Sequence, residues 1–192
     1  DMAKLKIEAL AARNARDGVP LQRRLIAYLP RYAPSLSRLS WLANLRDRIP
    51  GAARLSERLL GFSRQRSLPR WHASFLREAK PAQSAAVGSQ REVLLFVDTF
   101  NNYFARENAR AATRVLEAAG YTVHTNAVPT VGARPLCCGR TFLTAGMVEH
   151  ARGEARRTPD TLLPYVRRGL AVVGLEPSSL LTLRDQFLPS HS

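Results

Sequence analysis

The sequence contains few cysteines, and the two it has are adjacent. Cys137 and Cys138 are the only cysteines among 192 residues. Neighbouring cysteines rarely form a disulfide, because the bond needs Cα atoms about 4.4–6.8 Å apart with matched Cβ directions. A fold held together by disulfides is therefore excluded. No cysteine or histidine has zinc-like spacing, so we expect scattered surface or packed side chains at His72, His124, His150 and His191.

Long hydrophobic runs are also missing. No apolar run approaches the roughly 18–20 residues that a membrane-spanning helix needs, and no basic and then apolar leader opens the chain. We therefore expect a protein that is cytoplasmic or peripheral to the inner membrane. The chain begins at Asp1, without an initiator methionine, and enters a helical pattern at once. This beginning is typical of a piece excised from a longer protein.

Acidic residues are scarce: 15 Asp and Glu stand against 29 Lys and Arg, for a net charge of +14. Residues 1–91 hold 18 basic and 6 acidic side chains, whereas residues 92–192 hold 11 and 9. A basic surface of this kind favours an acidic protein, an anionic membrane face or nucleic acid. Nucleic acid is the least expected partner, because the sequence has no helix-turn-helix or other reading motif and no exposed aromatic residues between the arginines.

The first part of the chain, residues 1–79, is predicted to be all helical. Proline, glycine and apolar spacing predict helices at about 1–17, 21–29, 35–48, 52–60 and 70–79. An apolar stripe is formed by Leu36, Leu39, Trp41, Leu42 and Leu45, and it indicates an amphipathic layer that needs a cover. If that cover is missing, Trp41, Leu42 and Phe62 should be exposed. Residues 80–91 are small and polar, and they predict a linker.

The second part, residues 92–192, is predicted to be an α/β unit. Val93 to Val97 form a continuous apolar run, which is typical of a strand buried on both faces. Further strands are predicted at 121–125 and 170–175, and helices at 108–119, 141–157 and 160–168. This alternation predicts a Rossmann-like, three-stranded parallel βαβαβ unit, with ligands beyond the carboxyl ends of its strands. No glycine-rich phosphate fingerprint follows the first strand, so we do not expect this unit to bind a nucleotide directly.

The stretch from Cys137 to Arg140 carries the most chemical information. Two adjacent thiols before a helix could present two thiolates to one metal centre, with Gly139 allowing close approach of the backbone. The alternative is that the cysteines are two small buried apolar residues. Strand ends should bring Asp98, Thr99 and Tyr103, together with Glu176 and Ser179, to the same edge of the sheet. We therefore expect both sulfurs to lie near the Ser179 hydroxyl, without a disulfide.

Four segments together resemble a known family. These are DTFNNYF at 98–104, RAATRVLEAAGYTV at 110–123, LCCGRTFLTAGMVEHAR at 136–152 and VVGLEPSSLLTLRDQF at 172–187. They resemble the CCG cysteine-rich domain of FAD-linked oxidases of the D-lactate and glycolate dehydrogenase type, which is related to a component of heterodisulfide reductase. Residues 1–20 resemble the segment that follows the ferredoxin motifs of those proteins. The resemblance makes residues 92–192 the first half of that domain, with a second CCG motif further along.

The resemblance implies an electron-transfer role. Cys137 and Cys138 would be ligands of an iron–sulfur cluster, with Gly139 and Arg140 beside it, and FAD would lie on another domain. Electrons from a 2-hydroxy acid would pass from the flavin towards a carrier or quinone. Partners would be other domains of the same protein, an acidic electron carrier or a membrane face. Thr99 and Ser179 stand where relatives can carry cysteine.

Two thiols cannot complete a four-cysteine cluster, so the chain alone should be inactive and metal-free. Two alternatives stay open. The basic helices could serve as a nucleic-acid-binding module, or the whole chain could be a protein-interaction module without a redox role.

Overall fold

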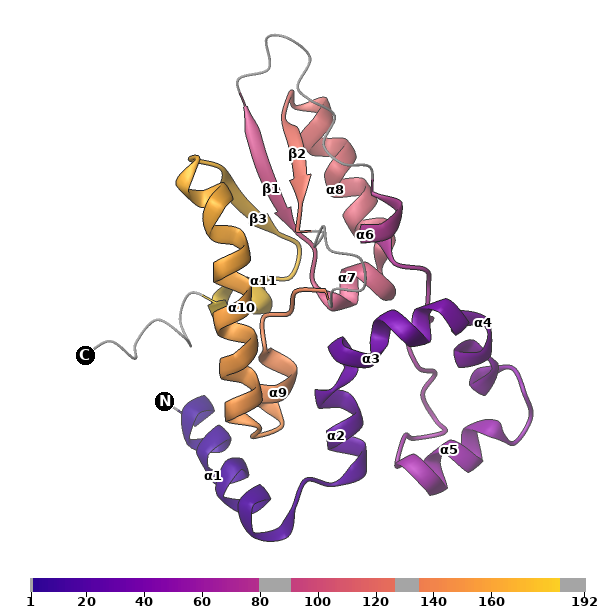
Figure 1. Ribbon diagram of the computed structural model, residues 1–192. Helices are drawn as coiled ribbons and strands as arrows, with labels where there is room; N and C mark the ends of the chain where they lie inside the picture. Colours follow the sequence, from indigo (N-terminus) through magenta and orange to yellow (C-terminus); the bar gives the residue numbers. More distant parts are fainter. Residues whose placement is uncertain (1, 80–90, 127–134, 184–192) are drawn as a thin grey trace.

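The computed structural model describes residues 2–79, 91–126 and 135–183. A helical segment, residues 2–79, precedes an α/β unit that begins at Arg91 (Figure 1). The sequence-based prediction of the fold class is confirmed, because a three-stranded parallel sheet follows an all-helical segment. The predicted linker at 80–91 lies outside the described residues except for Arg91.

The sheet consists of β1 (Glu92–Phe96), β2 (Thr122–Thr125) and β3 (Ala171–Gly174), in the order β2-β1-β3. Both neighbours run parallel to β1, and Val93 is paired with Val123 on one side and Ala171 on the other. Because β1 is central, all its residues except Glu92 are buried. The continuous apolar run in the sequence reflects this central position.

Each face of β1 packs against different helices (Figure 1). Val93 and Leu95 pack on Phe75 of α6 (Phe75–Glu78) and on Ala109 of α8 (Arg106–Ala118). On the opposite face, the side chains of Leu94 and Phe96 pack on Leu136 and on Leu162 of α10 (Val148–Arg167). Helices on both faces leave the carboxyl edge of the sheet as the place where loops gather.

Short helices begin at that edge: α7 (Thr99–Tyr103), α9 (Arg140–Thr144) and α11 (Pro177–Leu181). The stretches predicted as helical, 141–157 and 160–168, are mostly helical, but the break lies at 145–147, because α10 continues without interruption through Pro159 and Pro164. Beside the first proline, Thr158 is fully buried and its hydroxyl donates to the Cys137 carbonyl (2.8 Å). The packing of this face of α10 stabilises the helix by more than the loss of one backbone hydrogen bond at Pro159 costs.

The helical segment comprises α1 (Met2–Asp17), α2 (Leu21–Ala27), α3 (Leu29–Leu36), η1 (Ser37–Leu39), α4 (Ser40–Ala43), η2 (Asn44–Asp47) and α5 (Ala52–Leu60). We call residues 37–70, which extend away from the sheet, the arm (Figure 1). No helix in the described ranges combines the length and the apolar character needed to cross a membrane.

Two predicted helices differ from the structure. The stretch 35–48 is divided into short turns, with Pro34 inside α3, because polar side chains in it bond to distant backbone. Asn44 both donates to the Trp71 carbonyl (2.9 Å) and accepts from the Trp71 N–H (2.8 Å). The predicted helix at 70–79 is reduced to α6, since the His72 N–H donates to the Tyr103 carbonyl rather than within a helix.

The helical segment packs directly on the α/β unit. Ala27 of α2 shares a buried cluster with Phe142 of α9, and the Thr141 hydroxyl donates to the Ala27 carbonyl (3.0 Å). At the tight turn between α9 and α10, a Cβ on Gly146 would lie only 2.8 Å from the backbone of Leu10. The arm is less well covered: Trp41 and Leu42 are exposed as predicted, whereas Phe62 is half-buried.

Candidate functional site

A pocket of about 310 Å³ opens at the carboxyl edge of the sheet. Its walls come from the segment after β1, the loop before α9 and the segment after β3. Seven of the residues expected at this edge line it: Asp98, Thr99, Cys137, Cys138, Arg140, Glu176 and Ser179. The fold therefore brings together residues that are up to 81 positions apart in the chain.

Asp98 shapes the wall that follows β1. Its carboxylate accepts the backbone N–H groups of Phe100 (2.8 Å) and Asn101 (3.2 Å), which caps α7. Asn126 fixes the end of β1 by bonding both the N–H and the carbonyl of Val97. The Asp98 carboxylate thus acts as a structural cap at the edge of the pocket.

Thr99 places an unsatisfied hydroxyl at the pocket. The residue is only 5% exposed, and its Oγ1 has no hydrogen-bond partner among the described residues. Leaving a buried hydroxyl unpaired costs free energy of about 1–3 kcal/mol. A bound group that offers a donor or acceptor at this wall would recover that cost.

The cysteine loop is held from behind by α10. The Thr158 hydroxyl donates to the Cys137 carbonyl, and Arg157 donates to the Pro135 carbonyl. Gly139 has φ +80°, and a Cβ at this position would lie 2.9 Å from the Ala151 carbonyl oxygen. Glycine is required here both by the left-handed backbone and by the contact with α10.

The two thiols face the pocket together with Ser179. Both cysteines are free and buried, with exposures of 4% and 6%. The Cys138 thiol donates to Ser179 Oγ (3.4 Å), and the Gly139 N–H donates to Cys137 Sγ (3.4 Å). The two sulfurs and the Ser179 hydroxyl therefore lie at one place, without a disulfide.

The pair is arranged to hold one negative charge. A hydrogen bond from the Cys137 thiol lowers the pKa of Cys138 to about 6, with further help from the Ser179 hydroxyl and the Arg140 backbone N–H, while burial opposes the shift. The same hydrogen bond, together with burial, raises the pKa of Cys137. These shifts favour a pair that shares one proton, with the negative charge placed mainly on Cys138.

Arg140 and Glu176 stand at the mouth of the pocket. Arg140 Nη1 donates to the Ser178 carbonyl (3.3 Å), which ties the start of α9 to α11. The Glu176 carboxylate accepts the Ser178 hydroxyl. Both charged side chains thus organise the loop after β3, and Ser178 is a further wall residue between the predicted Glu176 and Ser179.

Two predicted site residues do not line the pocket. Gly139 contributes its backbone conformation and its N–H, as described above. Tyr103 is only 1% exposed, lies at the inner side of α7, and its ring is part of the buried interior. Phe100, within the predicted stretch after β1, also lines the pocket, and three further wall residues have no sequence signal: Ile26, Thr141 and Thr144. Ile26 comes from α2 and is recognisable only from the packing of the helical segment.

The donor set fits part of a thiolate-ligated metal centre. Two thiols and a serine hydroxyl converge, but no group of three or more His, Cys, Asp and Glu side chains able to hold a metal ion occurs in the described part of the chain. A standard iron–sulfur cluster takes four cysteine ligands. This edge could therefore provide two of them, and the others would have to come from outside the described residues.

Comparisons with known proteins give no match: the chain matches no family model, no curated protein and no solved structure. Inference about function therefore depends on the geometry of the pocket and on the sequence resemblance given above.

Proposed function

We propose that the pocket is half of an iron–sulfur site, in which Cys137 and Cys138 supply two thiolate ligands and another part of a larger protein supplies the rest. The observation that carries this proposal is the convergence of both thiols, Ser179 and the unsatisfied Thr99 hydroxyl in one pocket. When bound, such a cluster accepts and passes on single electrons. The resemblance extends the proposal to the electron-transfer part of a FAD-linked 2-hydroxy-acid oxidoreductase.

The residues of this chain have defined tasks in that role. Cys138 is poised as a thiolate, so that little free energy is needed to deprotonate the first ligand near neutral pH. The Gly139 N–H already donates to Cys137 Sγ and can keep doing so when that sulfur is ionised. Hydrogen bonds to ligand sulfurs also tune the reduction potential of a cluster. A location in the cytoplasm, at the inner membrane face, would suit the basic helical segment.

The first test uses the chain itself and Cd²⁺ as a thiolate-seeking probe. We expect thiolate-to-metal charge-transfer absorbance with the wild-type chain near pH 8, and its loss in Cys137→Ala and Cys138→Ala. Thr113→Ala is the control, because its hydroxyl bonds only the Ala109 carbonyl within α8. If wild-type absorbance did not exceed that of the alanine variants, the pair could not be presenting sulfur to a metal.

The second test uses the longer protein that the proposal requires, purified without oxygen. Cys137→Ala and Cys138→Ala should lower the iron and sulfide content and slow electron delivery to an external acceptor, while the substrate still reduces the flavin. Thr113→Ala should leave all three unchanged. Unaltered iron content and turnover in the Cys137→Ala/Cys138→Ala double variant would show that the pair is structural.

A further inference from the structure

A second, larger hollow lies between the arm and the rest of the molecule. It has a volume of about 830 Å³, and its walls come from α2, α3, α4, η2, α5, the stretch 62–71, α7 and Phe104. The lining is almost wholly apolar and includes Leu29, Leu36, Leu55, Leu59, Phe62 and Trp71. We call this hollow the apolar groove. Its volume is in the range of pockets that bind a small ligand.

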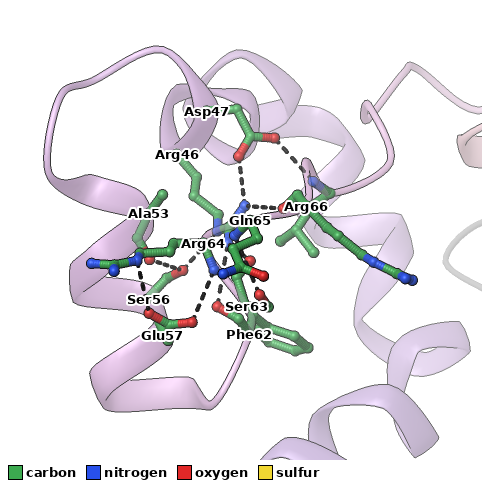
Figure 2. A network of polar contacts seen from close by, with 11 residues as sticks. Arg46, Asp47, Ala53, Ser56, Glu57, Phe62, Ser63, Arg64, Gln65 and Arg66 are labelled. Atoms are coloured by element: carbon green, nitrogen blue, oxygen red, sulfur yellow. Dashed lines mark hydrogen bonds and ion pairs between the residues drawn. The ribbon is translucent and has the colours of Figure 1, made fainter.

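Helix α5 lines the groove with a mostly apolar face and is held to the rest of the arm by polar contacts. Leu55 and Leu59, one turn apart, are 58% and 63% exposed although they line the groove. Within the lining, Ser56 Oγ accepts from Arg46 Nε (2.7 Å), and the neighbouring Glu57 carboxylate accepts the Arg64 backbone N–H (3.1 Å) (Figure 2). These bonds tie α5 to the rest of the arm, and Leu55 and Leu59 stay in the groove lining beside Ser56.

Arg46 is the centre of that network (Figure 2). Besides Ser56, it pairs with Asp47 (2.5 Å) and donates to the carbonyl of Ser63 (2.8 Å), with longer bonds to the carbonyls of Phe62 and Arg66. The N–H groups of the Arg46 guanidinium already donate to groups of the arm, so they are not available as hydrogen-bond donors to an occupant of the groove. An occupant must therefore offer an apolar surface to the groove.

The arm, which forms one side of the groove, is strongly basic. Residues 37–70 contain eight arginines and only two acidic residues, Asp47 and Glu57. Asp47 pairs with Arg46 and Glu57 lies beside Arg64. Six further arginines of the arm are exposed and form no ion pair with any described residue: Arg38, Arg48, Arg54, Arg58, Arg66 and Arg70. An apolar occupant flanked by acidic groups would match both the apolar lining of the groove and the positive charge of the arm.

We propose that the apolar groove binds an acidic amphipathic α-helix of a partner protein. Leucine-like side chains spaced at i, i+3 or i+4, and i+7 would enter the groove, and acidic residues on either side would face the arginines. A bilayer surface fits less well, because Leu55 and Leu59 line a hollow instead of protruding. Nucleic acid fits less well, because the groove walls offer few polar groups. This inference is independent of the iron–sulfur proposal.

The groove adjoins the thiol pocket. Ile26 and Phe100 line both hollows, so one side chain from α2 and one from α7 form a common wall. A helix bound in the groove would contact side chains that also form the wall of the thiol pocket. The partner is thereby placed beside the site, whatever group that site holds.

Trp71 provides a built-in reporter of binding. It lines the groove, whereas the other tryptophan, Trp41, is exposed and outside it, so Trp41→Phe leaves a single signal. The probe is a synthetic peptide of about 18 residues, or about five helical turns, with a leucine stripe and glutamate elsewhere. We expect saturable changes in Trp71 fluorescence with this peptide and not with a scrambled peptide of the same composition.

Lysine substitutions separate apolar contact from charge. Leu55→Lys/Leu59→Lys adds positive charge but removes the apolar wall, and we expect binding roughly 10-fold or more weaker. Both leucines are more than half exposed, so the variant should stay folded by circular dichroism. Val115→Lys is the matched control, since Val115 is an exposed apolar residue of α8 outside the groove, and it should bind as the wild type does.

Several outcomes would overturn the proposal. Equal binding of the scrambled peptide, or unchanged binding by Leu55→Lys/Leu59→Lys, would show that charge alone acts. Tighter binding to vesicles of phosphatidylglycerol and phosphatidylcholine, or to duplex DNA, would assign the arm to those partners instead. No binding to the leucine–glutamate peptide at low salt would remove the site altogether. None of these results bears on Cd²⁺ binding by the thiols.

Discussion

The α/β unit and the arm bury opposite kinds of side chain. In the α/β unit, leucine and phenylalanine of β1 are enclosed between helices, and polar groups gather at the open edge. In the arm, the guanidinium of Arg46 is enclosed by hydrogen bonds, while Leu55 and Leu59 remain exposed. The difference indicates that the α/β unit is stabilised by its own apolar core, whereas the arm is held by polar contacts and leaves apolar surface exposed.

Truncating the same amino acid in each region should reveal the largest difference. Leu94 is fully buried in β1, and Leu94→Ala should lower the free energy of unfolding by about 2–5 kcal/mol because it leaves a cavity. Leu59→Ala should change it by less than about 0.5 kcal/mol, since Leu59 is mostly exposed. Urea unfolding of both variants measures this contrast. Equal losses would mean that the arm is as much a part of the core as the sheet.

Two glycines offer the next contrast, within the α/β unit. Gly139 and Gly169 both have positive φ, but only at Gly139 would a Cβ meet the backbone. Gly169→Ala should cost about 1–2 kcal/mol of stability through backbone strain alone. Gly139→Ala should cost roughly 1–3 kcal/mol more, because Cβ would press on the Ala151 carbonyl. Thermal unfolding of the two variants measures this difference. Similar losses of stability in both would mean that α10 moves away from the cysteine loop to make room for the Cβ.

A smaller effect is expected where the helical segment joins the α/β unit. Arg31 lies 3.6 Å from the buried carboxylate of Glu154 and stacks over Phe142. Removing one partner of a buried pair costs about 3–5 kcal/mol. We expect about 1–3 kcal/mol for Arg31→Met, because Arg157 also lies beside Glu154.

Arg152→Met is the matched control for Arg31→Met. The Arg152 pair with Glu149 is exposed, so its loss should cost less than about 0.5 kcal/mol in the same denaturant titration. If both variants lost the same small amount of stability, the contact between α3 and α10 would not contribute to holding the two parts together.

The sequence was sufficient for the α/β unit because its local and tertiary signals agree. The run from Val93 to Val97 is apolar because both faces of β1 are covered, and Gly120 stands just past the end of α8. Parallel strands then bring their carboxyl ends to one edge, which placed Cys137, Cys138 and Ser179 at a single predicted location.

The arm could not be predicted in the same way, because side chains there bond to distant backbone. Asn44 bridges to Trp71, and Arg46 bonds to carbonyls up to 20 positions further on, so a helical pattern over 35–48 is broken into turns. In the same way, Ile26 forms part of the thiol pocket only because α2 packs on α9. Contacts between distant segments leave no periodic trace in the sequence.

The smallest expected effect on stability comes from the Ser179 hydroxyl, at the open carboxyl edge of the sheet. The pKa of Cys138 is lowered from an ordinary value of 9.0 to about 6, chiefly by the Cys137 thiol and partly by Ser179. A lowered pKa stabilises the folded state above the unfolded value, and this contribution is lost as the pH falls from about 9 to about 6. Above pH 9 the trend should reverse, because the raised pKa of Cys137 keeps its proton bound only in the folded state.

When Cys138 is ionised it can no longer donate, and the Ser179 hydroxyl donates to the thiolate instead; Ser179→Ala removes this bond, so the pKa of Cys138 should rise. The gain in unfolding free energy between pH 6 and pH 9 should shrink by about 1 kcal/mol, the typical worth of one hydrogen bond. Thiolate absorbance in the ultraviolet, measured with a reductant present, gives the pKa independently of stability. Ser178→Ala is the control, since the Ser178 hydroxyl donates to Glu176 and not to a sulfur. If Ser179→Ala and Ser178→Ala titrated alike, the Ser179 hydroxyl would not be stabilising the thiolate, and the lowered pKa would have to come from Cys137 and the Arg140 backbone N–H alone.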